Sequence, residues 1–139
     1  MYDPYFLYCE DLEWGDRAKR LGEVGYAHNS VVAHKYGTTI GSSQSRAARS
    51  ALSVYMTARN AVLFTRRNYP AMLAPTVAMQ VIQAARLLAV GAPRNFGFAL
   101  RGIFDGCLGK TGRPDPMPTS PAAAADRNAA FCVPTRPSP

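Results

Sequence analysis

Near the start of the chain, the hydrophobic and polar positions predict one short helix between two extended segments. Residues 5–9 are mostly aromatic or apolar and predict a short strand or extended run. From Glu10 to Leu21, a sparse apolar stripe, acids in the first turn and bases near the end predict a helix that Gly22 ends. Residues 23–36 are rich in β-branched and aromatic side chains and predict extended structure around a turn at 28–30.

Farther along, the apolar positions recur at three- and four-residue steps, which is typical of amphipathic helices. A first such helix is predicted over residues 45–68, where Arg59 interrupts the apolar stripe and Pro70 ends the pattern. A second is predicted to begin at Pro75 and to run to about Val90, because proline is tolerated in the first turn of a helix.

A third helix is predicted over residues 93–108. Gly97, Gly102 and Gly106 each weaken it by about 1 kcal/mol relative to alanine, so tertiary packing or a surface must compensate. Its side chains divide into an apolar side and a charged side, namely Phe96, Leu100, Ile103, Phe104 and Cys107 against Arg94, Arg101 and Asp105.

The charge of the 139-residue chain is +7 overall, but it is unevenly distributed. Residues 1–23 hold six acids and three bases, whereas the rest holds thirteen bases and three acids. This asymmetry favours an acidic pocket beside a basic surface that meets phosphates or anionic lipid. From Arg113 onward the chain is rich in proline and alanine, which predicts a disordered tail.

Neither a disulfide framework nor a membrane span is indicated by the pattern. The three cysteines are widely separated and lack zinc-site spacing, which fits a reducing compartment. The most apolar stretch, Val77 to Val90, is shorter than the roughly 20 residues that a span needs and contains Gln80, Gln83 and Arg86. The third helix could still lie on an anionic leaflet, but packing against a neighbouring helix is the favoured interpretation.

The first candidate for chemistry is the acidic pair Glu10–Asp11. Aromatic side chains surround it in the sequence and are expected to shield it from water, namely Tyr5, Phe6, Tyr8 and Trp14. A shielded carboxylate at a helix start can act as a general base if a substrate hydroxyl approaches it. Alternatively, the two acids only complement the helix N-terminus, and for an isolated pair this second interpretation is the better one.

The second candidate is His34, which precedes a Gly/Ser/Thr loop at residues 37–43. A lone histidine in a strand is more often a hydrogen-bonded core or surface residue than a metal ligand. Imidazole is nevertheless a common ligand of transition metals, and small loop residues allow a ligand to approach the backbone closely. Neither candidate decides the function alone.

Taken in order, three blocks of sequence carry a resemblance to a known family: FLYCEDLEWGDRAKRLG, then SVVAHKYGTTIGSS, then SVYMTARNAVLFTRRNYP. Together with the later RGIFDGCLGKTGR, they closely resemble the C-terminal half of bacterial glycosyltransferase family 2 enzymes, especially the rhamnosyltransferase-like branch. The resemblance extends over about residues 2–112. It rests on the order and spacing of separated blocks, because the Glu-Asp pair by itself is uninformative.

The resemblance implies an α/β fold, with residues 1–43 forming the C-terminal end of a Rossmann-like GT-A catalytic domain. Residues 44–112 would be a helical C-terminal region of amphipathic helices, and residues 113–139 a disordered tail. The implied activity is inverting transfer of a hexosyl group from a nucleotide-sugar donor to a glycan or lipid-linked acceptor. Resemblance to the rhamnosyltransferase-like branch suggests rhamnose as the sugar. A divalent cation, Mg²⁺ or Mn²⁺, would bind the donor diphosphate through ligands largely outside this chain.

The resemblance also implies roles for single residues on the acceptor side. Asp11 matches the family's catalytic base, which deprotonates the attacking acceptor hydroxyl, and Glu10 would orient the acceptor or the base. Trp14 would wall the acceptor pocket, with core packing as the alternative at even odds. Arg59 and Asn60 match a further family block, and a buried arginine that pairs with the acidic N-terminal segment is favoured over a phosphate contact.

On the donor side, the resemblance implies that His34 helps to hold the metal or the diphosphate. Lys35 and Ser42 would lie near the leaving phosphates, where cationic and backbone donors stabilise the developing charge. The chain departs from the family because it has no Asp-x-Asp motif before Glu10 or later. We therefore expect a fragment that transfers no sugar alone, located in the cytoplasm or peripherally on the inner face of the cell membrane.

Two functions of other classes remain open. One is a basic membrane-surface or protein-interaction module without catalysis, which the positive charge after residue 23 and the apolar helices favour. The other is a nucleic-acid-binding segment, which ranks last because the basic residues are scattered instead of forming one stripe.

Overall fold

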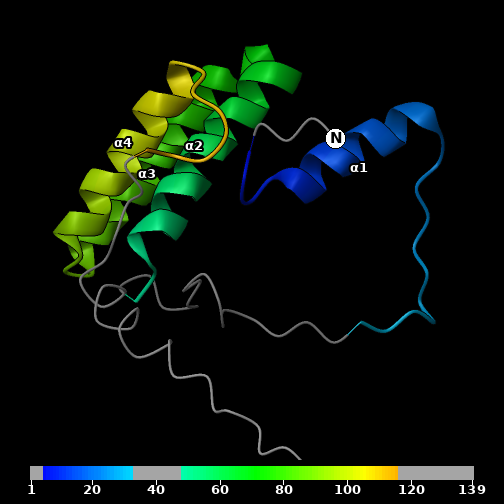
Figure 1. The fold of residues 1–139 in the computed structure, drawn as a ribbon, viewed down its shortest axis with the longest axis horizontal. Helices are drawn as coiled ribbons and strands as arrows, with labels where there is room; N and C mark the ends of the chain where they lie inside the picture. Colours follow the sequence, from blue (N-terminus) through cyan, green and yellow to red (C-terminus); the bar gives the residue numbers. More distant parts are fainter. Residues whose placement is uncertain (1–4, 33–47, 116–139) are drawn as a thin grey trace, which may run out of the picture.

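The computed structural model describes residues 5–32 and 48–115, which form helices, with a long non-helical segment after the first of them and short turns between the others (Figure 1). The elements in chain order are α1 (Glu10–Leu21), α2 (Ala51–Asn68), the 3₁₀-helix η1 (Pro70–Met72), α3 (Leu73–Ala89) and α4 (Pro93–Cys107). No strand occurs among the described residues, so the predicted α/β, Rossmann-like fold is wrong for this part of the chain. Of the predicted tail, residues 113–139, the part from 116 onward lies outside the described residues.

The two segments predicted to be extended fail to form strands for different reasons. In residues 5–9, the backbone of Phe6, Tyr8 and Cys9 adopts positive φ angles of 66°, 63° and 68°, which turn the chain tightly instead of extending it. In residues 23–32, the predicted turn is confirmed by a hydrogen bond of 3.1 Å from the Ser30 amide to the Ala27 carbonyl. The residues on either side of this turn are exposed and meet no neighbouring strand in the described part of the chain.

Helix α2 is the centre of the molecule. It packs against α4 and α3, and eleven of its eighteen residues are buried. It begins at Ala51, later than the predicted residue 45, because the Ser50 hydroxyl accepts a hydrogen bond of 3.1 Å from the Ser53 amide and caps the first turn. Burial on several sides explains why its apolar stripe is broad and interrupted.

Two glycines allow α4 to approach α2 closely. A Cβ atom on Gly102 would lie 2.4 Å from the Tyr55 carbonyl oxygen, and one on Gly106 would lie 2.8 Å from the Arg59 carbonyl oxygen. Close packing of the α4 backbone against α2 thus offsets the helix propensity lost at these two glycines, as expected from the sequence. Gly97 differs, since nothing lies within 4 Å of its Cβ position.

The predicted sides of α4 are reversed in part. Its buried positions include Asn95, Gly102 and Asp105, whereas Leu100 and Phe104 are 39% and 62% exposed. Small residues and a paired carboxylate face α2 because this contact is too close for large side chains. The large apolar side chains are left on the outside.

Helix α3 continues from η1 with hardly a break, so that a helical stretch of 20 residues runs from Pro70 to Ala89. Its mean hydropathy is 1.3, and 11% of it is buried. By length and composition this stretch could cross a membrane, which corrects the prediction that the apolar segment is too short. Pro75 was predicted to start the helix but lies within the first turn of α3. The helix begins earlier, at Leu73, because it continues directly from the 3₁₀ turn of η1.

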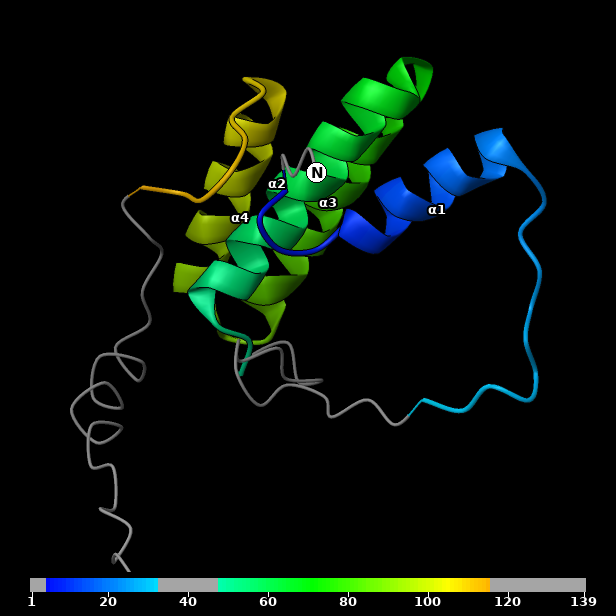
Figure 2. The same ribbon diagram turned by 45° about the vertical axis from the view of Figure 1, so that its right-hand side comes forward.

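The three long helices share two small apolar clusters. One joins Val54 of α2 to Ala84 and Leu87 of α3 and Ala99 of α4. The other centres on Ala58, Val62 and Ile103, with Leu73 and Val77 packed against it. Figure 2 shows α1 directed away from this bundle, so that only its first turns lie near α2.

We predict that Gly102→Ala destabilises the fold by about 1–3 kcal/mol, because the added methyl group would overlap backbone atoms of α2 that cannot move aside. Gly97→Ala in the same helix is the matched control and should stabilise by up to about 1 kcal/mol, since the site is open and alanine favours helix. Urea unfolding of both variants measures the difference. Equal free energies of unfolding for the two variants would show that the close approach is unimportant.

Candidate functional site

The turn that leads into α1 is held by two buried side chains of α2, Arg59 and Asn60. The Asn60 amide donates to the carbonyl oxygens of Tyr5 at 3.0 Å and Tyr8 at 3.2 Å, and also to that of Leu7. Arg59 donates to the Tyr5 carbonyl at 2.9 Å through Nη2. We call these five residues the anchor: Tyr5, Leu7, Tyr8, Arg59 and Asn60.

The arginine also fixes the other end of the described chain. Its Nη1 donates to the Gly112 carbonyl at 2.8 Å, and its Nε donates to the Asn60 side-chain oxygen at 3.0 Å. The guanidinium carbon lies 5.6 Å from the centre of the Tyr55 ring. Arg59 is therefore buried and reaches the N-terminal segment as predicted, but it binds backbone carbonyl groups and not carboxylates.

The positive φ angles before α1 are sustained by the anchor. Left-handed backbone costs a non-glycine residue about 1–2 kcal/mol, and Phe6, Tyr8 and Cys9 all adopt it. Because Asn60 gathers several carbonyl groups of the turn at one point, the surrounding structure holds this conformation. The direction in which α1 starts is consequently set by α2.

The buried acid of α1 is Glu13, not a member of the Glu10–Asp11 pair. Its Oε2 accepts hydrogen bonds from the Tyr5 hydroxyl at 2.9 Å and from the Asn68 amide at 3.0 Å. Its Oε1 lies 4.0 Å from Nε of Arg67. Burial, together with the hydrogen bond to Glu13, raises the pKa of Tyr5 well above its usual range. This cluster joins α1 to the C-terminal end of α2.

Glu10 and Asp11 lie in the first turn of α1 and are exposed. Their side chains form no hydrogen bond or ion pair within residues 5–32 and 48–115. Trp14 is 63% exposed. It therefore does not pack in the core and does not shield the two acids. The predicted aromatic enclosure of the acidic pair is wrong, because the aromatic Tyr5 is used inside the fold to bind Glu13.

Three predicted donor-side residues, His34, Lys35 and Ser42, lie outside the described residues. The expected proximity of Asp11 and His34 across one cleft therefore stays a prediction. Within the described part of the chain, no group of three or more His, Cys, Asp or Glu side chains could hold a metal ion. We derive no step through a metal from these residues.

A second buried carboxylate, Asp105, lies between α4 and α2. It accepts hydrogen bonds from the Tyr55 hydroxyl at 2.8 Å and from Lys110 Nζ at 2.7 Å, and Arg101 Nε lies 3.8 Å away. Burial opposes its ionisation, but the hydrogen bonds and charges of Lys110, Tyr55 and Arg101 outweigh burial and hold the pKa of Asp105 below its usual value. Asp105 is therefore an ionised carboxylate whose partners give it a structural role.

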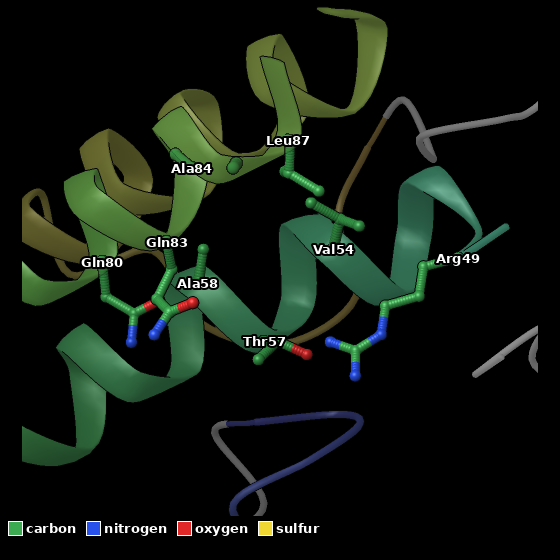
Figure 3. Close-up of a pocket in the computed structure, with 9 residues that line it drawn as sticks. Arg49, Val54, Thr57, Ala58, Gln80, Gln83, Ala84 and Leu87 are labelled. Atoms are coloured by element: carbon green, nitrogen blue, oxygen red, sulfur yellow. The ribbon is translucent and has the colours of Figure 1, made fainter. Parts of the chain in front are cut away.

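A shallow hollow of about 130 Å³ lies between α2 and α3 (Figure 3). Val54, Ala84 and Leu87 contribute apolar side chains, while the amides of Gln80 and Gln83 lie close together at one end. The lining contains no carboxylate, histidine or cysteine, so it offers no general base. The first turn of α1 is consequently the stronger candidate for acid–base chemistry.

Cys9, which precedes α1, is partly buried. Burial, with a smaller effect of the Glu10 charge, raises the pKa of its thiol to about 11. The thiol is therefore protonated at neutral pH and is a poor nucleophile. Cys9 is therefore part of the turn that the anchor holds and supplies no nucleophile.

Comparison of the chain with models of known protein families, with curated proteins and with solved structures found no match.

Sequence reasoning found Arg59 and Asn60 but missed Glu13, Asn68 and Asp105. A signal existed for Asp105, because Arg101 precedes it by one helical turn and a lysine follows five residues later. No comparable signal existed for Glu13 and Asn68, which are 55 residues apart in the chain.

We predict that Asn60→Ala destabilises the fold by about 1–3 kcal/mol, because the carbonyl groups of the N-terminal turn lose their shared buried donor. Hydrogen exchange should show α1 opening more readily, while α3 and α4 keep their protection. The exposed Asn29 supplies the control, Asn29→Ala, which should leave stability within about 0.5 kcal/mol. Unchanged exchange of α1 in Asn60→Ala would contradict the anchor.

A pH dependence follows from Asp105. Since its pKa is lower in the folded than in the unfolded chain, its ionised form stabilises the fold above about pH 4, and this contribution is lost as the pH falls through the folded pKa. Asp105→Asn should therefore be less stable than the parent at neutral pH, and the gap should shrink on acidification. Urea unfolding at a series of pH values measures it, with the exposed Asp115→Asn as control. A gap independent of pH would contradict the assignment.

Proposed function

We propose that this chain supplies the acceptor side of an inverting glycosyltransferase, with Asp11 as the general base. The observation that supports it is the anchor, which fixes the turn immediately before Glu10 and Asp11 while leaving both carboxylates exposed. A base must be held in position and must also be reachable by the proton that it removes. Both conditions are met at this helix start.

The proposed reaction moves one proton and one glycosyl group. A carboxylate oxygen of Asp11 takes the proton of an acceptor hydroxyl, and the hydroxyl oxygen forms a bond to the anomeric carbon of the donor sugar. The bond from that carbon to the diphosphate oxygen breaks, and its electron pair leaves with the nucleoside diphosphate. Attack opposite the leaving group inverts the configuration, so one base suffices and no covalent intermediate with the chain is required.

Glu10 and Trp14 are proposed to receive the acceptor. Glu10 is exposed beside Asp11 and can accept hydrogen bonds from other hydroxyl groups of the acceptor. Trp14 lies on the same short helix, 63% exposed, and its ring offers an apolar surface on which a sugar can pack. An exposed tryptophan has few structural reasons to be there, which favours a binding role.

The anchor gives a physical reason for two blocks of the family resemblance to occur in one chain. The block around Glu10–Asp11 and the block around Arg59–Asn60 are about 50 residues apart in sequence, yet they meet through the carbonyl groups of Tyr5 and Tyr8. The second block would then act as a positioning device for the base. This contact supports the proposal independently of the resemblance itself.

The donor and its divalent cation are proposed to be held mainly by groups outside the described residues. His34, Lys35 and Ser42 remain the proposed contributions of this chain to the metal and the diphosphate. The acceptor is proposed to be a glycan or a lipid-linked sugar, and the reaction to take place on the cytoplasmic side, where nucleotide sugars are the donors.

The test uses the longest polypeptide encoded by the reading frame that contains this chain, assayed with nucleotide sugars and glycan acceptors. Asp11→Asn should lower kcat by about 10²–10⁴-fold, because the attacking hydroxyl loses its base. Trp14→Ala should mainly raise the KM for the acceptor. Glu23→Gln changes an exposed acid outside α1 and serves as control. An unchanged kcat for Asp11→Asn would overturn the assignment.

A further inference from the structure

Helix α3 buries Ala84 and Leu87, but it leaves many large apolar side chains on its outer side. Thr76, Gln80 and Gln83 lie on the side that packs toward α2, where the Thr76 hydroxyl lies 3.2 Å from that of Thr65. The outward positions are large and apolar, and several are about half exposed, namely Met79 at 52%, Val81 at 44%, Ile82 at 50% and Leu88 at 48%. A helix that only covers the core of a water-soluble monomer carries polar side chains on its outer side.

Helix α4 buries Ala99 and Ile103 and likewise leaves large apolar side chains outside. It directs Asn95, Gly102 and Asp105 toward the interior and leaves Leu100 and Phe104 on the outside at 39% and 62% exposure. The two helices are consecutive, pack against one another and run side by side (Figure 1). We call their exposed apolar side chains the apolar face: Met79, Val81, Ile82, Leu88, Leu100 and Phe104.

The helical region that carries the apolar face is strongly basic. Residues 48–115 contain nine basic residues and two acids, of which Asp105 is buried and paired and Asp115 is the last residue of the range. Arg86 is the one charged residue of α3, and Arg94 lies exposed at the start of α4. An apolar surface on a part of the molecule with a large excess of basic residues matches an anionic bilayer, which offers hydrocarbon beneath negative headgroups.

We propose that the apolar face lies flat on a bilayer that contains anionic lipids, with α3 and α4 parallel to the membrane plane. The long stretch Pro70–Ala89 could span a membrane by its length, but its inner side packs on a helix that buries Arg59 and on α4, which buries Asp105. A spanning orientation would carry these charges to hydrocarbon depth, where they are costly. Lying in the interface keeps the buried charges above the hydrocarbon and inserts only the outer side chains.

The experiment is flotation of the full 139-residue chain with vesicles of phosphatidylcholine, with and without phosphatidylserine. We expect binding to the anionic vesicles that weakens as salt is added. The double variant Ile82→Asp with Phe104→Asp should weaken binding by at least about tenfold, since each change places a charge where an apolar side chain would insert. Both positions are exposed, so the helical content should be unchanged.

Two matched controls separate the face from general hydrophobicity and charge. Val31→Asp with Tyr26→Asp alters side chains that are each 90% exposed outside the bundle, and it should leave vesicle binding unchanged. Arg94→Gln should weaken binding to anionic vesicles by about fivefold, whereas Arg17→Gln on α1 should not.

Equal loss in the face variant and in its control would overturn the proposal, as would absence of vesicle binding. Sedimentation that shows a dimer of the chain, dissociated by the face variant, would assign the face to a second copy and would also overturn it. Sugar transfer enters none of these measurements, so this inference and the proposed activity can fail separately.

Discussion

The hydrogen bonds of Arg59 and Asn60 are the constraint on which the rest of this structure depends. These two residues are adjacent in α2, fully buried, and bound to carbonyl groups near both ends of the described chain. A buried guanidinium is tolerable only if its donors are satisfied, and the Tyr5 and Gly112 carbonyls supply acceptors. The same bonds hold the left-handed turn that starts α1, so burial and backbone direction are fixed together.

Around this centre, polar side chains share the interior with apolar ones, and further apolar side chains occupy much of the outside. Glu13 and Asp105 are buried with partners, and the glycines of α4 bring its backbone against α2. The outer sides of α3 and α4 carry the large apolar residues. A small helical bundle built in this way gains specificity from hydrogen bonds and close packing, and it leaves its most hydrophobic surface available to another phase or partner.

The proposed acid–base site and the proposed membrane face occupy different parts of the molecule. Asp11 projects from α1, whereas the apolar face belongs to α3 and α4, and α2 lies between as the helix that contacts both. Helix α2 holds the turn before the proposed base, and it also packs against α3 and α4, which carry the proposed membrane face. This arrangement would suit an acceptor that is itself attached to lipid. The anchor would then connect the proposed base to the helices of the proposed membrane face.

The sequence by itself determined the helices, because hydrophobic spacing, Pro93, Gly22 and the charges at the ends of α1 act locally. The family resemblance also pointed to Arg59 and Asn60, with a buried arginine expected but no role for the asparagine. Tertiary structure alone decided that Glu13 is the buried acid, that residues 5–9 turn instead of extending, and that α4 faces inward with its glycines. These outcomes depend on partners some 50 residues distant, such as Asn68 for Glu13. Periodicity identifies two sides of a helix, but only the neighbouring helix determines which of them is covered.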